Sequence, residues 1–125
     1  MNERILIVDD NEVNREILQE IFEPDYQILM AQNGATALKL AERHHPRVVL
    51  LDVMLPDYDG YEVCRKLRSM PGMTRAKIIM ISAKAMPSEC AEGYSAGADA
   101  YITKPFDDAE VMAVVRGRVR DRLNA

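Results

Sequence analysis

Short apolar runs alternate along this chain with longer segments in which apolar residues recur at helical spacing. Runs rich in Val, Ile and Leu without polar alternation are typical of parallel strands that are buried on both faces. The second run instead alternates at Tyr26, Ile28 and Met30, which suits a strand at the edge of a sheet. Strands are therefore predicted at 4–8, 26–31, 47–52, 77–81 and 100–103, and helices at 12–22, 35–44, 60–69, 88–96 and 108–123.

Residue types at the predicted helix starts support these boundaries. Asn11 can cap the first helix, while Asp59 and Asp107 precede the third and fifth helices, each with a glutamate three residues later. Five consecutive strand–helix units predict an α/β fold built on a right-handed, doubly wound parallel sheet. An eight-unit barrel is excluded because it needs about 250 residues, whereas this chain has 125 residues. We expect residues 1–125 to form a single domain.

Polar side chains follow four of the predicted strands at the point where each strand ends. Asp9 and Asp10 follow the first strand, Asp52 ends the third, Ser82 follows the fourth and Lys104 follows the fifth. The carboxyl ends of parallel strands meet at one edge of an open α/β sheet, where ligands bind. We therefore expect these five side chains to lie close together.

The residue types at this edge point to a divalent cation and a phosphoryl group. Two like charges about 4 Å apart repel by about 1 kcal/mol in water and about 4 kcal/mol at an effective dielectric of about 20. Mg²⁺ relieves such repulsion, and a carboxylate can act as the nucleophile of an aspartyl phosphate. A lysine ammonium and a serine hydroxyl can bind phosphoryl oxygens. Taken singly, Asp10 would be a helix cap and Lys104 a surface lysine, so only the five residues together indicate such a site.

Composition narrows the classes of partner and compartment. The net charge of −4 gives no electrostatic footprint for binding nucleic acid or an anionic membrane. No apolar stretch approaches the roughly 20 residues of a membrane span, and the N-terminus does not have the pattern of a signal peptide. Cys64 and Cys90 lack the spacing of a metal or redox site, so we interpret them as reduced, half-buried thiols of a cytoplasmic protein, with a disulfide as the lesser alternative.

The chain resembles the receiver (phosphoacceptor) domain of the bacterial two-component response regulator family. The segments that carry the resemblance are 5–11 (ILIVDDN), 49–60 (VLLDVMLPDYDG), 81–83 (ISA) and 97–106 (GADAYITKPF). The resemblance implies a flavodoxin-like (βα)5 sheet of strand order 2-1-3-4-5. It also implies a phosphoacceptor with its own phosphorylation and dephosphorylation chemistry rather than a multiple-turnover enzyme.

The resemblance assigns roles to the residues at the acidic edge. Asp52 would accept a phosphoryl group from a phosphohistidine of a sensor histidine kinase or phosphotransfer protein. Asp10, Asp52 and the backbone carbonyl of Met54 would bind Mg²⁺, with Asp9 contributing through water. Lys104 would contact the phosphoryl group.

A second set of residues matches the family's switch. The bond between Lys104 and Pro105 is expected to be cis, which costs little before proline. Ser82 would move toward the phosphoryl group while Tyr101 turns inward, rearranging the surface of the fourth helix, last strand and last helix. Met54 and Lys84 occupy positions where the family tunes dephosphorylation. Ala100 and Val114 stand where many DNA-binding regulators carry an Asp and an Arg that pair across a dimer, which argues against that dimer and that output class.

The sequence is also compatible with other partners and with two alternative functions. A fused or separate effector, or a homodimer formed on phosphorylation, is compatible with the sequence, whereas direct binding of nucleic acid or membrane is not expected. One alternative is a haloacid-dehalogenase-like phosphatase, which also uses an aspartyl phosphate but places its nucleophile after the first strand in an Asp-x-Asp arrangement. The other is a receiver-like interaction module that no longer uses phosphate.

Overall fold

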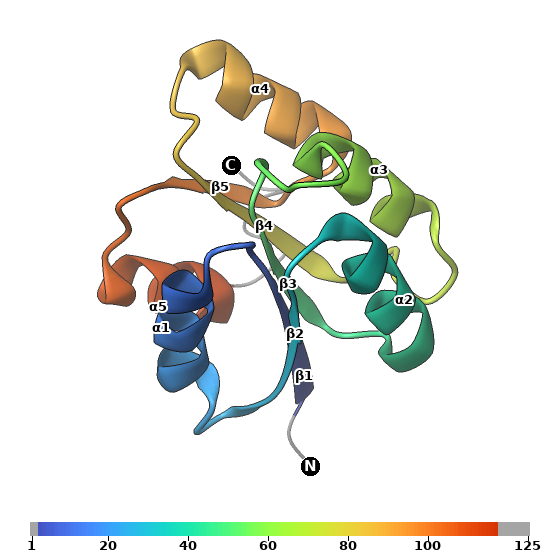
Figure 1. The fold of residues 1–125 in the computed structure, drawn as a ribbon, viewed down its shortest axis with the longest axis vertical. Coiled ribbons are helices and arrows are strands. Elements are labelled where there is room, and N and C mark those ends of the chain that lie inside the picture. The colour runs from blue at the N-terminus through green and yellow to red at the C-terminus, as the bar shows by residue number, and fades with distance from the viewer. Residues whose placement is uncertain (1–2, 118–125) are drawn as a thin grey trace.

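The computed structural model describes residues 3–117 and contains one five-stranded parallel sheet of order β2-β1-β3-β4-β5. The predicted doubly wound α/β fold with this strand order is therefore confirmed (Figure 1). The strands are β1 (Glu3–Val8), β2 (Tyr26–Ala31), β3 (Val48–Leu51), β4 (Lys77–Ser82) and β5 (Ala100–Thr103). The helices are α1 (Glu12–Phe22), α2 (Gly34–His44), α3 (Gly60–Ser69), α4 (Pro87–Ala96) and α5 (Asp108–Arg116).

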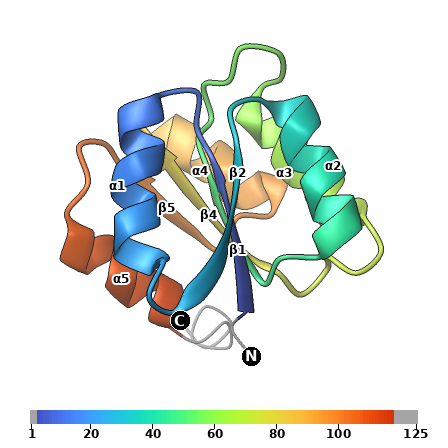
Figure 2. The same cartoon turned by 60° about the horizontal axis from the view of Figure 1, so that its bottom comes forward.

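Helices cover both faces of the sheet. In Figure 2, α1 and α5 lie on one side of the strands, and α2 and α3 lie on the other. Successive side chains of a strand point to opposite faces. Accordingly, Ile5 and Ile7 of β1 pack in the core under α1 and α5, whereas Leu6 and Val8 pack in the core under α2 and α3. This burial on both faces explains the absence of polar alternation in β1, β3 and β4.

The helix caps follow the chemistry expected from the sequence. The side chain of Asn11 accepts a hydrogen bond from the backbone N–H of Asn14, and Asp59 and Asp107 accept from the N–H groups two residues further on.

The predicted elements agree with the observed ones to within one or two residues wherever the chain is described. The last helix was predicted to reach residue 123, and residues 118–123 of that prediction lie outside the described residues.

The two cysteines have different environments, and the prediction of half-buried thiols is wrong for one of them. Cys90 is half-buried, but Cys64 is fully buried, because it lies on the face of α3 that packs against the sheet. Burial raises the pKa of the Cys64 thiol to about 11, so it stays protonated and unreactive at neutral pH. Both cysteines are free thiols.

Among residues 3–117, no helix has the length and apolar character needed to cross a bilayer.

Candidate functional site

Three carboxylates converge at the carboxyl edge of the sheet. Asp9, Asp10 and Asp52 place oxygen atoms within 4.8 Å of one another, a grouping that could hold a metal ion. The register of β1 and β3 explains this convergence, because Val8 pairs with Leu51 and an aspartate follows each of them directly. Asp9 and Asp52 are only 3% and 5% exposed, whereas Asp10 faces solvent. The site therefore combines two buried carboxylates with one that is open to the surface.

Lys104 joins the two buried carboxylates. Its ammonium nitrogen lies 2.8 Å from Oδ2 of Asp9 and 2.8 Å from Oδ2 of Asp52. Burial by itself would lower the pKa of Lys104, but hydrogen bonds and charge from Asp52 and Asp9 outweigh burial and hold that pKa above its ordinary value. Lys104 is therefore a cation at neutral pH, and it offsets part of the repulsion between the two carboxylates.

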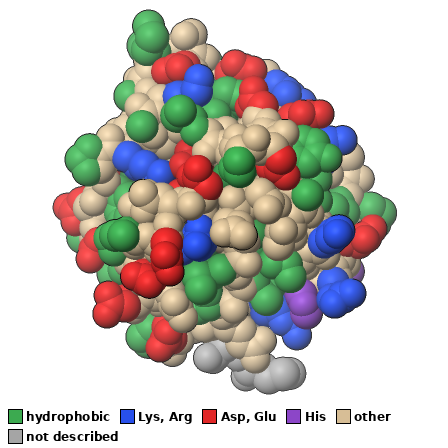
Figure 3. Space-filling model, viewed as in Figure 1, with side chains coloured by type: hydrophobic (Ala, Val, Ile, Leu, Met, Phe, Trp, Pro, Cys, Tyr) green, Lys and Arg blue, Asp and Glu red, His purple; other side chains and the backbone are tan. Residues whose placement is uncertain are grey.

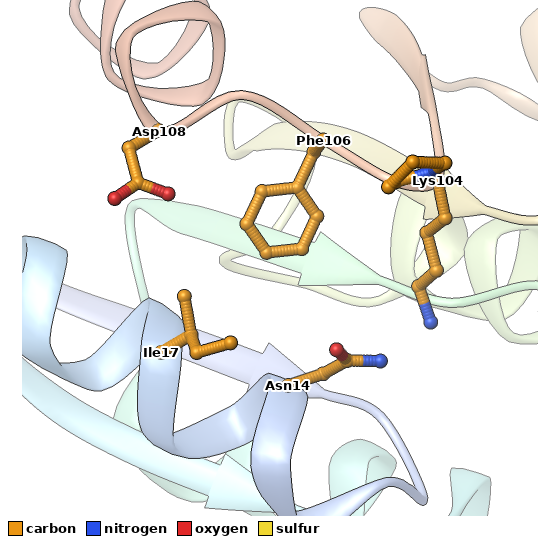
Figure 4. A pocket seen from close by; sticks show the side chains of 6 residues that line it. Asn14, Ile17, Lys104, Phe106 and Asp108 are labelled. Carbon is orange, nitrogen blue, oxygen red and sulfur yellow. The ribbon is translucent and has the colours of Figure 1, made fainter.

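The segment that carries Lys104 also forms the wall of an open pocket. The Lys104–Pro105 peptide bond is cis, and the Lys104 N–H donates to the carbonyl of Ser82 at 2.9 Å. Figure 4 shows the Lys104 side chain extending toward Asn14 at the start of α1, with Phe106 beside Ile17. The pocket measures about 410 Å³ and reaches from Lys104 to Asp108. Lys104 is thus shared between the acidic cluster and a pocket that lies between α1 and the start of α5.

The loop after β3 is folded back onto the strand end. The N–H of Met54 donates to Oδ1 of Asp52 at 3.0 Å, and Met54 forms an isolated antiparallel bridge with Asp59. The N–H of Gly60 donates to the carbonyl of Val53 at 2.8 Å. A Cβ atom at Gly60 would lie 2.4 Å from the backbone oxygen of Asp52, so only glycine allows this approach. The loop thereby keeps the Met54 backbone next to the Asp52 carboxylate.

Asp57, which the sequence analysis did not single out, anchors the same loop to α2. Its carboxylate accepts hydrogen bonds from the backbone N–H groups of Gly34 at 2.8 Å and Ala35 at 3.0 Å, at the first turn of the helix. These bonds, that from Ala35 foremost, lower the pKa of Asp57. Asn33 caps α2 from within the local sequence, but no local pattern indicates that an aspartate 23 residues away would also bind its first turn.

Ser82 and Tyr101 both attach to the segment that follows β4. Ser82 is fully buried, and its hydroxyl accepts from the N–H of Lys84 at 3.3 Å. The Tyr101 hydroxyl donates to the carbonyl of Lys84 at 2.7 Å. The ammonium of Lys84 lies 3.5 Å from a carboxylate oxygen of Glu89 in α4. Among the predicted site residues, Lys84 therefore contacts the first turn of α4 and Tyr101 contacts Lys84, while Asp9, Asp10, Asp52 and Lys104 form the acidic cluster.

A flavodoxin-like sheet with an acidic cluster and a lysine at its carboxyl edge defines a phosphoacceptor module. Comparison with known proteins gives the family: residues 5–116 match the model described as "Response regulator receiver domain". The chain belongs to the response regulator receiver domain family.

Relatives with curated descriptions support this assignment. The chain is 39% identical to the response regulator PleD of Caulobacter vibrioides over 98% of its own length and 27% of that protein. It is 43% identical to the alkaline phosphatase synthesis transcriptional regulatory protein PhoP of Bacillus subtilis, over 96% of its length and 50% of that protein. The chain thus spans about a quarter to a half of these relatives.

Solved structures share the whole fold. A BeF3-activated receiver domain of DrrB is 30% identical with a TM-score of 0.85, and each chain is covered completely. The receiver domain of the sensor histidine kinase PA1611 of Pseudomonas aeruginosa, solved with a magnesium ion in its active-site cleft, is 28% identical with a TM-score of 0.83 over both full lengths. Family membership excludes the phosphatase alternative, because a receiver is a phosphoacceptor rather than a multiple-turnover enzyme.

The distribution of charged side chains does not indicate another charged site on the face drawn in Figure 3. Acidic and basic side chains are interspersed there, and no large patch of one sign appears. The acidic cluster is therefore distinguished by the burial and close spacing of its carboxylates rather than by an excess of surface charge.

Proposed function

We propose that Asp52 is the phosphoacceptor and takes a phosphoryl group from a phosphohistidine of a sensor histidine kinase or phosphotransfer protein. The observation that carries this proposal is the position of Asp52 between Lys104 and the N–H of Met54. One carboxylate oxygen accepts from each donor, at 2.8 and 3.0 Å. Such donors can bind the oxygens that carry negative charge during phosphoryl transfer.

Mg²⁺ is the cofactor that suits the donor set. Lys104 pairs with two of the three carboxylates, so the cluster keeps an excess of negative charge, and its ligand atoms are all hard oxygens. Asp10, Asp52 and the backbone carbonyl of Met54 would hold the ion, with Asp9 acting through water. When bound, Mg²⁺ would neutralise charge on the transferred phosphoryl oxygens. Lys104 would then exchange a carboxylate partner for a phosphoryl oxygen, because its ammonium already lies against Asp52.

The response to phosphorylation is assigned to Ser82 and Tyr101. Ser82 ends β4 beside the acidic edge, and both side chains bind the backbone of Lys84, so a movement of this segment would affect both. The altered surface would comprise α4, β5 and α5. Met54 and Lys84 line a common pocket of about 410 Å³, which supports their role in controlling access of water to the phosphorylated residue.

The wider biology is proposed on the same basis. We place residues 1–125 in one receiver domain of a cytoplasmic two-component pathway, acting on a fused or separate effector. A homodimer that forms on phosphorylation is a second route to output. The Asp–Arg pair that many DNA-binding regulators use across such a dimer is replaced here by Ala100 and Val114.

Labelling with acetyl phosphate and Mg²⁺ tests the assignment of Asp52. The wild-type chain should take up one phosphoryl group, and Asp52→Asn should take up none while keeping its circular dichroism spectrum. Asp108→Asn, at an exposed aspartate on the far side of the Lys104 pocket, is the matched control and should label normally. Stoichiometric labelling of folded Asp52→Asn would refute the assignment. Absence of labelling in all three proteins would favour an interaction module that does not use phosphate.

A further inference from the structure

The ring of Tyr101 lies against a helical glycine of α4. A Cβ atom built at Gly93 would lie 2.8 Å from Cδ2 and 3.0 Å from Cε2 of Tyr101, and 2.9 Å from the sulfur of Met80. Real Cβ atoms essentially never approach other atoms this closely, so a side chain at position 93 and the ring of Tyr101 compete for one space. Glycine within a helix is disfavoured by about 1 kcal/mol relative to alanine, which points to a need for this space.

Tyr61 of α3 binds the same helix. Its side chain is only 4% exposed, and its hydroxyl donates to the carbonyl of Glu89 in α4 at 3.0 Å. The hydroxyls of Tyr61 and Tyr101 lie close together, since each affects the pKa of the other. Burial is the main cause that raises the pKa of both phenols, so both stay protonated across the physiological range. Both neutral hydroxyls are thus held by backbone carbonyls, Tyr61 by that of Glu89 and Tyr101 by that of Lys84.

The segment around Lys84 links the end of β4 to α4. The Ser82 hydroxyl accepts from the N–H of Lys84, and the Tyr101 hydroxyl donates to the carbonyl of the same residue. Glu89, whose carbonyl accepts from Tyr61, also binds the Lys84 ammonium and the N–H of Met86 through its carboxylate. A change at Ser82 can thus pass through Lys84 both to Tyr101 and to Glu89 in the first turn of α4, where Tyr61 is bound.

We propose that Tyr61 and Gly93 form a seat that holds the inward ring of Tyr101, so that Tyr61 is a positioning residue of the switch. Gly93 provides the room for the ring, and the Tyr61 hydroxyl ties the seated ring to α4. The inference rests on the proposed function, in which Tyr101 responds to phosphorylation of Asp52. A ligand at Asp52 that favours the seated ring must bind less tightly when the seat is damaged, because the two equilibria are linked.

Two variants damage the seat in different ways. Gly93→Ala fills the space and should displace the Tyr101 ring. Tyr61→Phe keeps the ring of residue 61 but removes its hydroxyl, and the loss of one hydrogen-bonding group should weaken the seated state by about three- to tenfold. Tyr94→Phe is the matched control for Tyr61→Phe, because it removes the hydroxyl of an exposed tyrosine. Ser95→Ala is the matched control for Gly93→Ala, because it introduces alanine at an exposed position of the same helix.

NMR of the free protein tests the seat itself. Nuclear Overhauser contacts between the Tyr101 ring and the α-protons of Gly93 are expected in the wild type and in both controls. The contacts should weaken in Tyr61→Phe, and the Tyr101 ring resonances should shift in Gly93→Ala. If Gly93→Ala fails to fold, Tyr61→Phe alone decides the matter. The proposal would be overturned if the Tyr101 ring contacts in Tyr61→Phe, and the Tyr101 ring shifts in Gly93→Ala, matched those of the Tyr94→Phe control.

Titration with beryllofluoride in the presence of Mg²⁺ tests the link to Asp52. The wild type and the controls should bind with equal affinity and shift the Tyr101 resonances, whereas Tyr61→Phe should bind about three- to tenfold more weakly. Equal binding by all four variants, with a wild-type response at Tyr101, would overturn the seat while leaving the function of Asp52 intact. A wild type that does not bind beryllofluoride would contradict the proposed function, and the inference would fall with it.

Discussion

The ammonium of Lys104 lies 2.8 Å from Oδ2 of Asp52, although the two residues are 52 positions apart in the chain. The same ammonium contacts Asp9 at the same distance. One cation thus serves two buried carboxylates that come from different strands. This arrangement makes the acidic edge both a structural ion-pair network and a site ready to exchange its partners.

Removal of Lys104 should destabilise the protein when no divalent ion is present. Lys104→Gln leaves Asp9 and Asp52 buried without their cation, which should lower the free energy of unfolding by about 2–3 kcal/mol. Added Mg²⁺ should restore part of this loss, because it supplies positive charge to the same carboxylates. Urea denaturation with and without Mg²⁺ measures both effects, with Lys39→Gln on the exposed side of α2 as the control. Equal loss in both variants would contradict the account.

Asp10 should matter for the cation rather than for the fold. It is the exposed member of the cluster, so Asp10→Asn should lower the affinity for Mg²⁺ at least about tenfold while leaving the fold intact. Without Mg²⁺ its melting temperature should rise modestly, since one repelling charge is removed. Calorimetric titration and thermal melts are the measurements. Unchanged affinity would refute Asp10 as a ligand, and a marked fall in the melting temperature would count against crowding of the carboxylates.

The contact between Asp57 and α2 predicts a dependence of stability on pH. The pKa of Asp57 is lowered in the folded protein by the N–H groups of Ala35 and Gly34, so its charged form stabilises the folded state. This contribution is fully present above the ordinary aspartate pKa of about 4, and it is lost as pH falls through the lower, folded-state value. Asp57→Asn should therefore be less stable than wild type at pH 7, and the difference should shrink in acid.

Urea denaturation at several pH values between about 7 and 3 checks this prediction. Asp108→Asn removes an exposed aspartate that does not cap another helix, so it should show a smaller and flatter difference. A deficit of Asp57→Asn that stays constant down to the most acidic value would contradict a role for the charged carboxylate.

Gly60 should resist substitution because of its neighbours, not its backbone angles. A Cβ atom there would meet the backbone of Asp52 and Val53, which cannot move without displacing the end of β3. Gly60→Ala should destabilise the protein by about 1–3 kcal/mol, the usual cost of overpacking, and should weaken Mg²⁺ binding through the displaced loop. Substitution of Ala35, an exposed residue of α2, by Ser provides a control. Wild-type stability of Gly60→Ala would contradict the close approach.

The sequence allowed the sheet and the acidic cluster to be predicted for the same physical reason. Strands buried on both faces need uninterrupted apolar runs, and such runs end visibly where Asp9 and Asp52 begin. The contacts of Asp57 with α2, and of Arg68 with Asp99 and the carbonyl of Gly97, could not be predicted. These contacts join residues more than 20 positions apart through single side chains, which leave no periodic pattern.

Burial of individual polar or small side chains was equally hard to predict. Cys64 was expected to be half-buried, because one residue in a short amphipathic helix does not reveal how closely that helix packs. The arrangement of Tyr61 and Gly93 around Tyr101 depends on three separate elements and became visible only in the folded structure. Sequence patterns thus place the strand ends, while the packing around them determines which neighbours each functional side chain meets.

The most direct test of the central claim is to locate the phosphoryl group. The protein would be treated with acetyl phosphate and Mg²⁺, the acyl phosphate reduced with borohydride, and the modified residue identified by peptide mass spectrometry. The account predicts one modified residue per chain, Asp52, and no modification when Mg²⁺ is removed by a chelator. Modification at another residue, or modification of Asp52 that is unaffected by loss of Mg²⁺, would contradict it.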